Sequence, residues 1–216
     1  MPASIYAVIT GEVADSRKIS QSKLGKVPDM IRKVIDRVNS NLEDSGKLEF
    51  EIIRMDEFLC MSKDVPASLQ TLLMLASNFR SLSQHELGLK TGLRLSMGIG
   101  PVELNKEQLR ESDGTAFRIA DEGLRKMKRN QRLVIASTDD QVNEELIVAC
   151  GFMDILLHDW SDEQAEALFM RLSGMNQMSI SEKLDISQPA VNRRLKAAHM
   201  EATERFLDRF YSIFGN

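Results

Sequence analysis

One stretch near the end of the chain constrains its fold more than any other, because its pattern specifies two short helices and a turn. From Gln177 it reads Gln-Met-Ser-Ile-Ser-Glu-Lys-Leu-Asp-Ile-Ser-Gln-Pro-Ala-Val-Asn-Arg-Arg-Leu-Lys. Ile180 and Leu184 are four residues apart and share one helix face. Asp185 stands where the chain must turn, and aspartate tolerates the left-handed conformation better than most residues. The stretch therefore predicts a helix-turn-helix.

The second helix of this pair is expected to run from Ser187 to His199. Ser187 is a favoured residue at the start of a helix, and Pro189 is tolerated in the first turn. Val191 and Leu195 are one turn apart and should face inward. The opposite face is then polar and basic.

This polar face carries the side chains that we predict to contact double-stranded DNA. They are Ser187, Gln188, Asn192, Arg193, Arg194 and Lys196. Recognition helices place such residues in the major groove, where arginine reads guanine and asparagine or glutamine reads adenine. Arg194 and Lys196 are better placed to contact phosphates, which position the helix without specifying a sequence. The alternative is a helix pair whose solvated face is basic for no functional reason.

The overall charge means that DNA contacts must come from a local basic face. The chain has 28 basic and 32 acidic residues and a net charge of −4, whereas small nucleic-acid binders are often strongly basic. Its two cysteines, Cys60 and Cys150, form no zinc-binding pattern. No apolar run reaches the length of a membrane span, so we expect a cytoplasmic protein with no membrane partner.

Two further helices should flank the pair. A supporting helix is expected over residues 161–173. After His199, an apolar stripe comprises Phe206, Leu207, Phe210, Ile213 and Phe214. This stripe either packs on the supporting helix or mediates a homodimer, as symmetric DNA half-sites often require.

The first part of the chain alternates between strand and helix patterns. Strands are expected at residues 5–10, 48–54, 57–62, 93–99 and 132–136, with helices at 28–42, 65–82 and after Gly114. Residues 138–150 look helical, and 152–158 are interpreted as a strand or a connector. The order β-α-β-β-α-β-α-β predicts an α+β, ferredoxin-like sheet covered by helices on one face. We expect this domain to span residues 1–155 and an all-α helix-turn-helix domain to span 156–216.

Several motifs point to a family. They are the segment from Ala7 to Arg17 (Ala-Val-Ile-Thr-Gly-Glu-Val-Ala-Asp-Ser-Arg), the turn Arg54-Met-Asp-Glu-Phe, Met97-Gly-Ile-Gly, and Ser112-Asp-Gly-Thr-Ala-Phe-Arg-Ile-Ala. Together they resemble the SatD family of bacterial proteins over nearly the whole chain. The front domain is more distantly similar to class III nucleotidyl cyclases, and the helix-turn-helix resembles region 4 of sigma factors.

The cyclase resemblance implies a site for Mg²⁺ or a nucleotide at Glu12 and Asp56, which match the two carboxylates that hold metal ions against a triphosphate. It also places Arg118 and Glu122 where cyclases carry an asparagine and an arginine that serve the transition state. An acidic Glu122 would repel phosphates there, so we assign no catalytic residue and no required cofactor. Asp56 also suits a tight turn for backbone reasons alone.

These observations favour a bacterial transcriptional regulator whose front domain, a degenerate cyclase-like fold, senses a ligand such as a small nucleotide or forms a dimer. One alternative is a nucleotide-binding or cyclase-like enzyme that uses Glu12 and Asp56 with Mg²⁺. Another is a protein-interaction module in which the helix-turn-helix binds protein.

Overall fold

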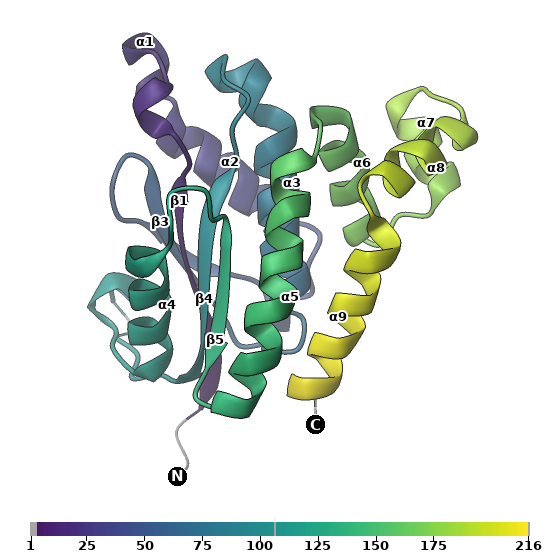
Figure 1. The fold of residues 1–216 in the computed structure, drawn as a ribbon. Coiled ribbons are helices and arrows are strands. Elements are labelled where there is room, and N and C mark those ends of the chain that lie inside the picture. The colour runs from purple at the N-terminus through teal and green to yellow at the C-terminus, as the bar shows by residue number, and fades with distance from the viewer. Residues whose placement is uncertain (1–3, 106, 216) are drawn as a thin grey trace.

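The computed structural model describes residues 4–105 and 107–215 (Figure 1). Its strands are β1 (Ile5–Val13), β2 (Glu49–Ile52), β3 (Glu57–Ser62), β4 (Leu93–Pro101) and β5 (Leu133–Ser137). The helices up to the end of the sheet region are α1 (Gln21–Leu24), α2 (Val27–Asn39), α3 (Ser68–Leu87), α4 (Thr115–Lys126) and α5 (Asp140–Asp159). The remaining helices are α6 (Asp162–Leu172), α7 (Gln177–Leu184), α8 (Gln188–Ala197) and α9 (Met200–Phe214). The expected α+β class and the expected order of elements are confirmed.

The five strands form one mixed sheet in the order β2-β3-β1-β4-β5. The central strand β1 is antiparallel to both of its neighbours, β3 and β4, and β5 is parallel to β4. The helix α4 connects these two parallel strands, as parallel pairing requires a crossover. The central position of β1 explains its nearly continuous burial.

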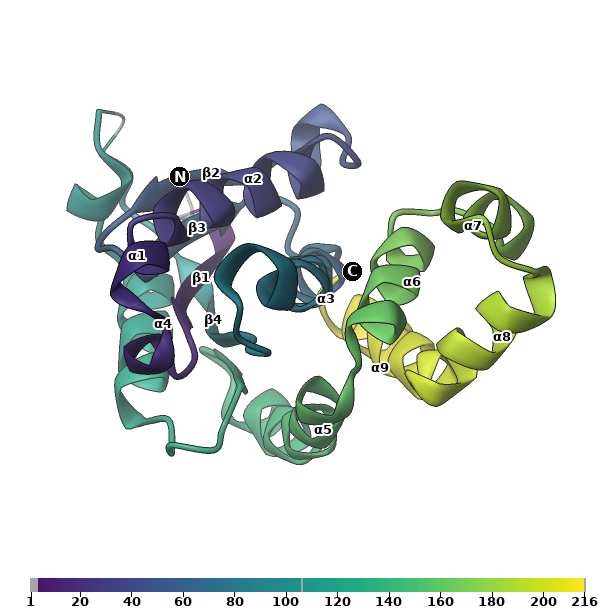
Figure 2. The same cartoon turned by 90° about the horizontal axis from the view of Figure 1, so that it is seen from above.

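Helices cover both faces of the sheet, which corrects the expectation of one covered face. Ala7 and Ile9 of β1 belong to a core that includes α2 and α3, whereas Tyr6 and Val8 belong to a smaller core with α4. Figure 2 shows α4 on one side of the strands and α3 on the other. The physical reason is visible in β1 itself, because a strand that is apolar at consecutive positions must bury both of its faces.

A close approach between α4 and β4 depends on Gly98. A Cβ atom at Gly98 would lie 2.1 Å from the carbonyl oxygen of Ala116 in α4, so a larger residue would push the helix away.

Residues 152–158 are helical, which corrects their interpretation as a strand or connector. They form the second half of α5, whose buried residues Leu146, Cys150 and Met153 follow helical spacing. The apolar character of the segment comes instead from exposed side chains such as Phe152 and Ile155. Residue 155 thus lies inside α5, and the two-domain division stays a prediction.

The rear helices share a core with the front of the molecule. The helix α6 packs on α3, and buried residues of α6 and α8 join the core that contains α2 and α3. Trp160, in the connection between α5 and α6, is 1% exposed, and its indole N–H donates a hydrogen bond to the carbonyl of Ala198 at 3.1 Å. The side chain of Ser161 caps α6.

The last helix packs on the front region as well as on the rear helices, and the expected homodimer stays a prediction. Phe210 of α9 is fully buried, and α9 contacts α3 and α5 of the front region as well as α8. Arg209 also donates two hydrogen bonds to Glu145 of α5, at 2.8 and 2.9 Å. The supporting helix α6 meets α9 through an ion pair between Arg171 and Glu204 at 3.0 Å. Much of the apolar stripe is therefore used within one chain.

Within residues 4–105 and 107–215, no helix combines the length and the apolar character needed to cross a membrane.

Candidate functional site

The helix pair α7–α8 forms around a tight turn, with Asp185 in the left-handed conformation (φ 51°, ψ 47°). Ile180 of α7 and Val191 and Leu195 of α8 are buried between the helices. This packing fixes the rotation of α8 about its own axis, and so determines which of its side chains reach solvent.

Four of the six predicted DNA-contacting residues are exposed. They are Ser187, Gln188, Arg193 and Lys196, while Asn192 is half-buried. The helix α8 carries three cations, Arg193, Arg194 and Lys196, and no carboxylate. The exposed carboxylates nearest to it along the chain are Asp185, in the turn before α8, and Glu201, in the first turn of α9.

Arg194 lies apart from the other predicted residues. Its side chain is half-buried and its Nη1 atom lies 3.9 Å from Oε2 of Glu166 in α6. Arg194 precedes the buried Leu195 and lies on the side of α8 that faces the supporting helix α6. It therefore contributes to packing and to an ion pair. The predicted phosphate contact of Arg194 is the least supported of the six.

A groove that sequence reasoning missed lies beside α8. It has a volume of about 810 Å³, and four α8 residues, Gln188, Asn192, Leu195 and Lys196, line one part of it. Asn176 and Gln177 at the start of α7 and several residues of α9 line the rest. The polar face of α8 thus forms part of the wall of a groove. Helical periodicity cannot show such a groove, because other helices form the rest of its wall.

Glu12 and Asp56 line a common pocket in the front region, with a volume of about 710 Å³. They come together because the backbone N–H of Val13, at the end of β1, donates a hydrogen bond to the carbonyl of Asp56 at 2.9 Å. The other charged residues that line the pocket are Asp15, Arg17, Lys18, Arg94, Arg129 and Arg132.

Glu12 already has a strong partner in this pocket. It lies directly across from Arg94 in the register of β1 and β4, and the two side chains form an ion pair through Nη1 and Oε1. The Nη2 atom of Arg94 donates to the carbonyl of Met127 at 2.9 Å. Among the described residues, the Nε atom of Arg94 is buried without a hydrogen-bond partner.

These contacts fit an anion better than a metal ion. Five cations (Arg17, Lys18, Arg94, Arg129 and Arg132) face three carboxylates (Glu12, Asp15 and Asp56) around the pocket, so its lining is net positive. In the part of the chain that the structure describes, no group of three or more His, Cys, Asp or Glu residues is arranged to hold a metal ion. We therefore derive no step through Mg²⁺.

A comparison with models of protein families shows to which family the chain belongs. The model of the SatD family matches residues 6–206, from the first strand into α9. The chain belongs to the SatD family. No curated protein matches it.

Among solved structures, the SatD chain is similar to one described as the crystal structure of the guanylyl cyclase Cya2. The two share 11% sequence identity with a TM-score of 0.49, over 66% of this chain and 77% of that chain. At this level of similarity the comparison supports no statement about the activity of the SatD protein.

The residues expected at the transition-state positions do not converge on the pocket of this SatD protein. The Nη2 atom of Arg118 pairs with Oδ2 of Asp113 at 2.6 Å, and Glu122 pairs with Lys126 at 2.5 Å. Neither Arg118 nor Glu122 is among the residues that line the pocket.

A further carboxylate, that of Glu57, which sequence reasoning missed, lies beside Glu12 across β1 and β3. Burial raises the pKa of Glu57, the cation of Arg54 opposes that change, and the nearby charges of Glu12 and Asp56 raise the pKa further. Removal of a carboxylate from water disfavours its charged form. Several carboxylates thus lie close together at this end of β1 and β3. The positive charge of Arg94 offsets the repulsion between them.

Proposed function

We propose that this SatD family protein binds double-stranded DNA through α8 and acts as a transcriptional regulator. The observation that supports the proposal best is the exposure of Gln188, Arg193 and Lys196 on a helix that contains no carboxylate. Buried Val191 and Leu195 hold this helix in one orientation. A rigid helix with exposed cations and amide groups can both neutralise phosphates and read base edges.

The position of the pair within the molecule also suits a bulky ligand. Figure 2 shows α7 and α8 at the end of the molecule away from the sheet, where α6 and α9 support them and no strand covers them. A duplex could therefore approach α8 without displacing the front region.

A mobility-shift assay with fragments of the source genome tests the proposal. The variant Arg193→Ala/Lys196→Ala removes two exposed cations from α8. The matched control Arg32→Ala/Lys47→Ala removes one exposed arginine and one exposed lysine from the front region. We expect loss of the Arg193 base contact to weaken specific binding by about 1–3 kcal/mol, loss of the Lys196 phosphate contact to weaken binding to all sequences, and the control to bind as the wild type does.

The same assay separates the alternatives. Equal losses in both double variants would show that net charge, and not α8, drives binding. Unchanged binding in the α8 variant would remove this helix from the DNA interface. If no fragment binds at all, the remaining use of the exposed α8 face is contact with a protein, as in an interaction module.

A second candidate function follows from the positive lining of the front pocket. We infer that the cations around Arg94 bind the phosphates of a nucleotide, without a catalytic role for Glu12 or Asp56. Equilibrium binding of labelled nucleoside triphosphates, with and without Mg²⁺, tests this function. We expect binding that survives chelation of metal and weakens in Arg129→Gln. Turnover that is abolished by Asp56→Asn would instead support the enzyme hypothesis.

A further inference from the structure

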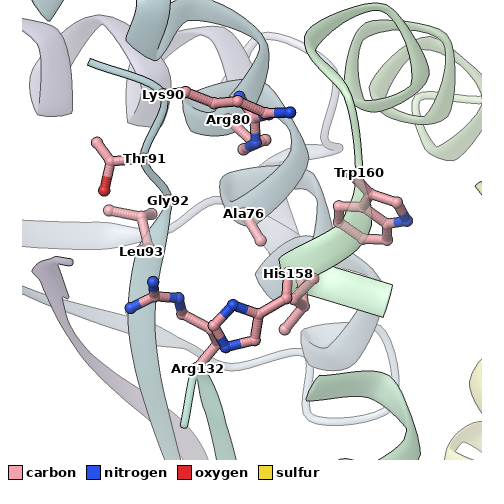
Figure 3. A pocket seen from close by; sticks show the side chains of 10 residues that line it. Ala76, Arg80, Lys90, Thr91, Gly92, Leu93, Arg132, His158 and Trp160 are labelled. Atoms are coloured by element: carbon pink, nitrogen blue, oxygen red, sulfur yellow. The ribbon is translucent and has the colours of Figure 1, made fainter. Parts of the chain in front are cut away.

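A smaller cavity of about 180 Å³ lies where the front region meets the rear helices (Figure 3). It is lined by Ala76 and Arg80 of α3, by Lys90, Thr91, Gly92 and Leu93 at the start of β4, by Arg132, and by Leu157, His158 and Trp160. In Figure 3, Arg80 and Lys90 lie at one end of the cavity and Arg132 and His158 at the other, with Trp160 on one side.

The lining of this cavity is strongly cationic. Arg80, Lys90 and Arg132 are positive, and none of the lining residues is a carboxylate. The carboxylates closest to these cations already have hydrogen-bond or ion-pair partners. Asp162 pairs with Arg80, Asp154 accepts the backbone N–H groups of Arg132 and Leu133, Glu163 accepts the Ser161 hydroxyl, and Asp15 lies 3.2 Å from Lys18 and 3.9 Å from Arg132.

Arg80 provides the decisive observation. Its side chain is 5% exposed, and its Nη1 atom pairs with Asp162. Its Nη2 atom is buried and has no hydrogen-bond partner among the described residues. Buried polar groups are normally paired, because an unpaired donor loses its hydration without compensation. An unpaired guanidinium N–H on a residue that lines a cationic cavity indicates a missing acceptor.

We propose that this cavity binds a phosphate group, either free or as the head of a small phosphate monoester. Three cations from different elements suit a compact dianion, and the cavity is smaller than the front pocket, which suits a phosphate group better than a whole nucleotide. The imidazole of His158 donates from Nε2 to the carbonyl of Asn130 at 2.6 Å, which fixes the ring beside Arg132. The cavity is distinct from the front pocket, although Arg132 lines both.

The site is placed to affect α8. Trp160 lines the cavity and also donates its indole hydrogen bond to Ala198, at the end of α8. A phosphate that orders Arg80 and Trp160 would thus order the support of α8 and favour DNA binding. This consequence rests on the DNA binding proposed above, whereas the phosphate site itself does not.

The fluorescence of Trp160, the sole tryptophan in the chain, provides a direct readout. The experiment titrates the full-length protein with inorganic phosphate, and with chloride at equal ionic strength as the control for salt. We expect a saturable change with phosphate only. Glycerol phosphate and acetate are titrated next, to distinguish a phosphate monoester and a carboxylate from free phosphate.

Two variants test the location without disturbing the core. Lys90→Gln removes an exposed cation, and we expect it to weaken phosphate binding about tenfold, the usual loss for one charge-assisted hydrogen bond. Gly92→Val adds a side chain where a Cβ meets no atom within 4 Å, and we expect it to fill part of the cavity and weaken binding at least as much. Lys63→Gln, on a remote exposed lysine, should bind as the wild type does.

Three results would overturn the proposal. They are a response to chloride or acetate equal to that with phosphate, normal binding in both cavity variants, or a loss in Arg129→Gln that the cavity variants do not share, which would place the anion in the front pocket. The link to α8 is tested separately, by DNA affinity with and without phosphate. Phosphate that binds but leaves DNA affinity unchanged overturns only the link, and absence of DNA binding under both conditions overturns the proposed function.

Discussion

The two regions of this molecule differ in the arrangement of their charged residues: cations are exposed on α8, whereas cations and carboxylates lie together in the front pocket. On α8, Arg193 and Lys196 extend into solvent from a helix without carboxylates. In the front pocket, Glu12 is paired with Arg94 across two strands, and Arg132 lies 3.9 Å from Asp15. Exposed, uncompensated cations can bind a large external anion, whereas paired charges mainly hold neighbouring elements together. This contrast is the basis for proposing a macromolecular partner for the rear region and a small ligand for the front.

The largest expected effect concerns the junction of the two regions. Trp160→Ala removes a buried ring and its hydrogen bond to Ala198, and should lower the free energy of unfolding by about 3–5 kcal/mol. Urea unfolding followed by circular dichroism measures it, with Trp160→Phe as the milder control. A loss below about 1 kcal/mol would mean that the rear helices are held independently of this residue.

The homodimer was expected through the apolar stripe of the last helix, but the exposed apolar face of α5 offers another surface for it. Ile147, Val148, Phe152 and Ile155 are 56–70% exposed and lie along one side of the helix. If two copies pair through this face, Phe152→Glu should weaken the dimer at least about tenfold, since a buried phenylalanine contributes about 1.5–3 kcal/mol.

Analytical ultracentrifugation of the wild type and of Phe152→Glu measures that change, with Met178→Glu as a control at another exposed apolar residue. A dimer would present two copies of α8, and symmetric DNA half-sites need such a pair of recognition helices. A dimer would therefore support DNA binding by the rear region. A wild type that is monomeric at all concentrations would contradict the homodimer.

The ion pair in the front pocket should be worth less than the packing of Trp160. Arg94→Met leaves Glu12 without its partner, and we expect a loss of about 1–2 kcal/mol because both side chains are partly exposed. The same change frees the carboxylate of Glu12, which lines the pocket together with Asp56, so binding of Mn²⁺, measured by electron paramagnetic resonance, should increase. Tight Mn²⁺ binding by the wild type would show that the front pocket is a metal site after all.

The smallest expected effect comes from Glu57. Because burial raises the pKa of Glu57 above its ordinary value of 4.5, its charged form is disfavoured in the folded protein. Its contribution to stability is complete below the ordinary pKa and is lost as the pH rises through the folded value. Glu57→Gln should therefore melt slightly above the wild type at neutral pH, and at the same temperature well below pH 4.5. A lower melting temperature at neutral pH would contradict this sign.

The rear region could be predicted further than the front because its pattern is local. The spacing of Ile180, Val191 and Leu195 determines which α8 residues point outward, and the turn at Asp185 formed as expected. The position of Arg194, 3.9 Å from Glu166 on another helix, could not be read from this local pattern, and contact of the six residues with DNA stays a prediction.

The front pocket depends on contacts between distant segments. The resemblance to cyclases placed Glu12 and Asp56 together, and the structure does so too. Their cationic neighbours were missed, because Arg94 is 82 residues from Glu12 and meets it only through the register of β1 and β4. A single sequence shows that strands exist but not which residues they set side by side. The same limit hid the cavity beside Trp160.

One measurement tests the contrast between the two regions most directly. Residue-resolved NMR of the backbone amides, recorded while duplex DNA from a bound fragment is added, reports which surface the DNA contacts. The account predicts that the largest shifts occur at Ser187, Gln188, Arg193 and Lys196, with little change around Glu12 and Arg94. Shifts centred on the front pocket, with α8 unaffected, would contradict it.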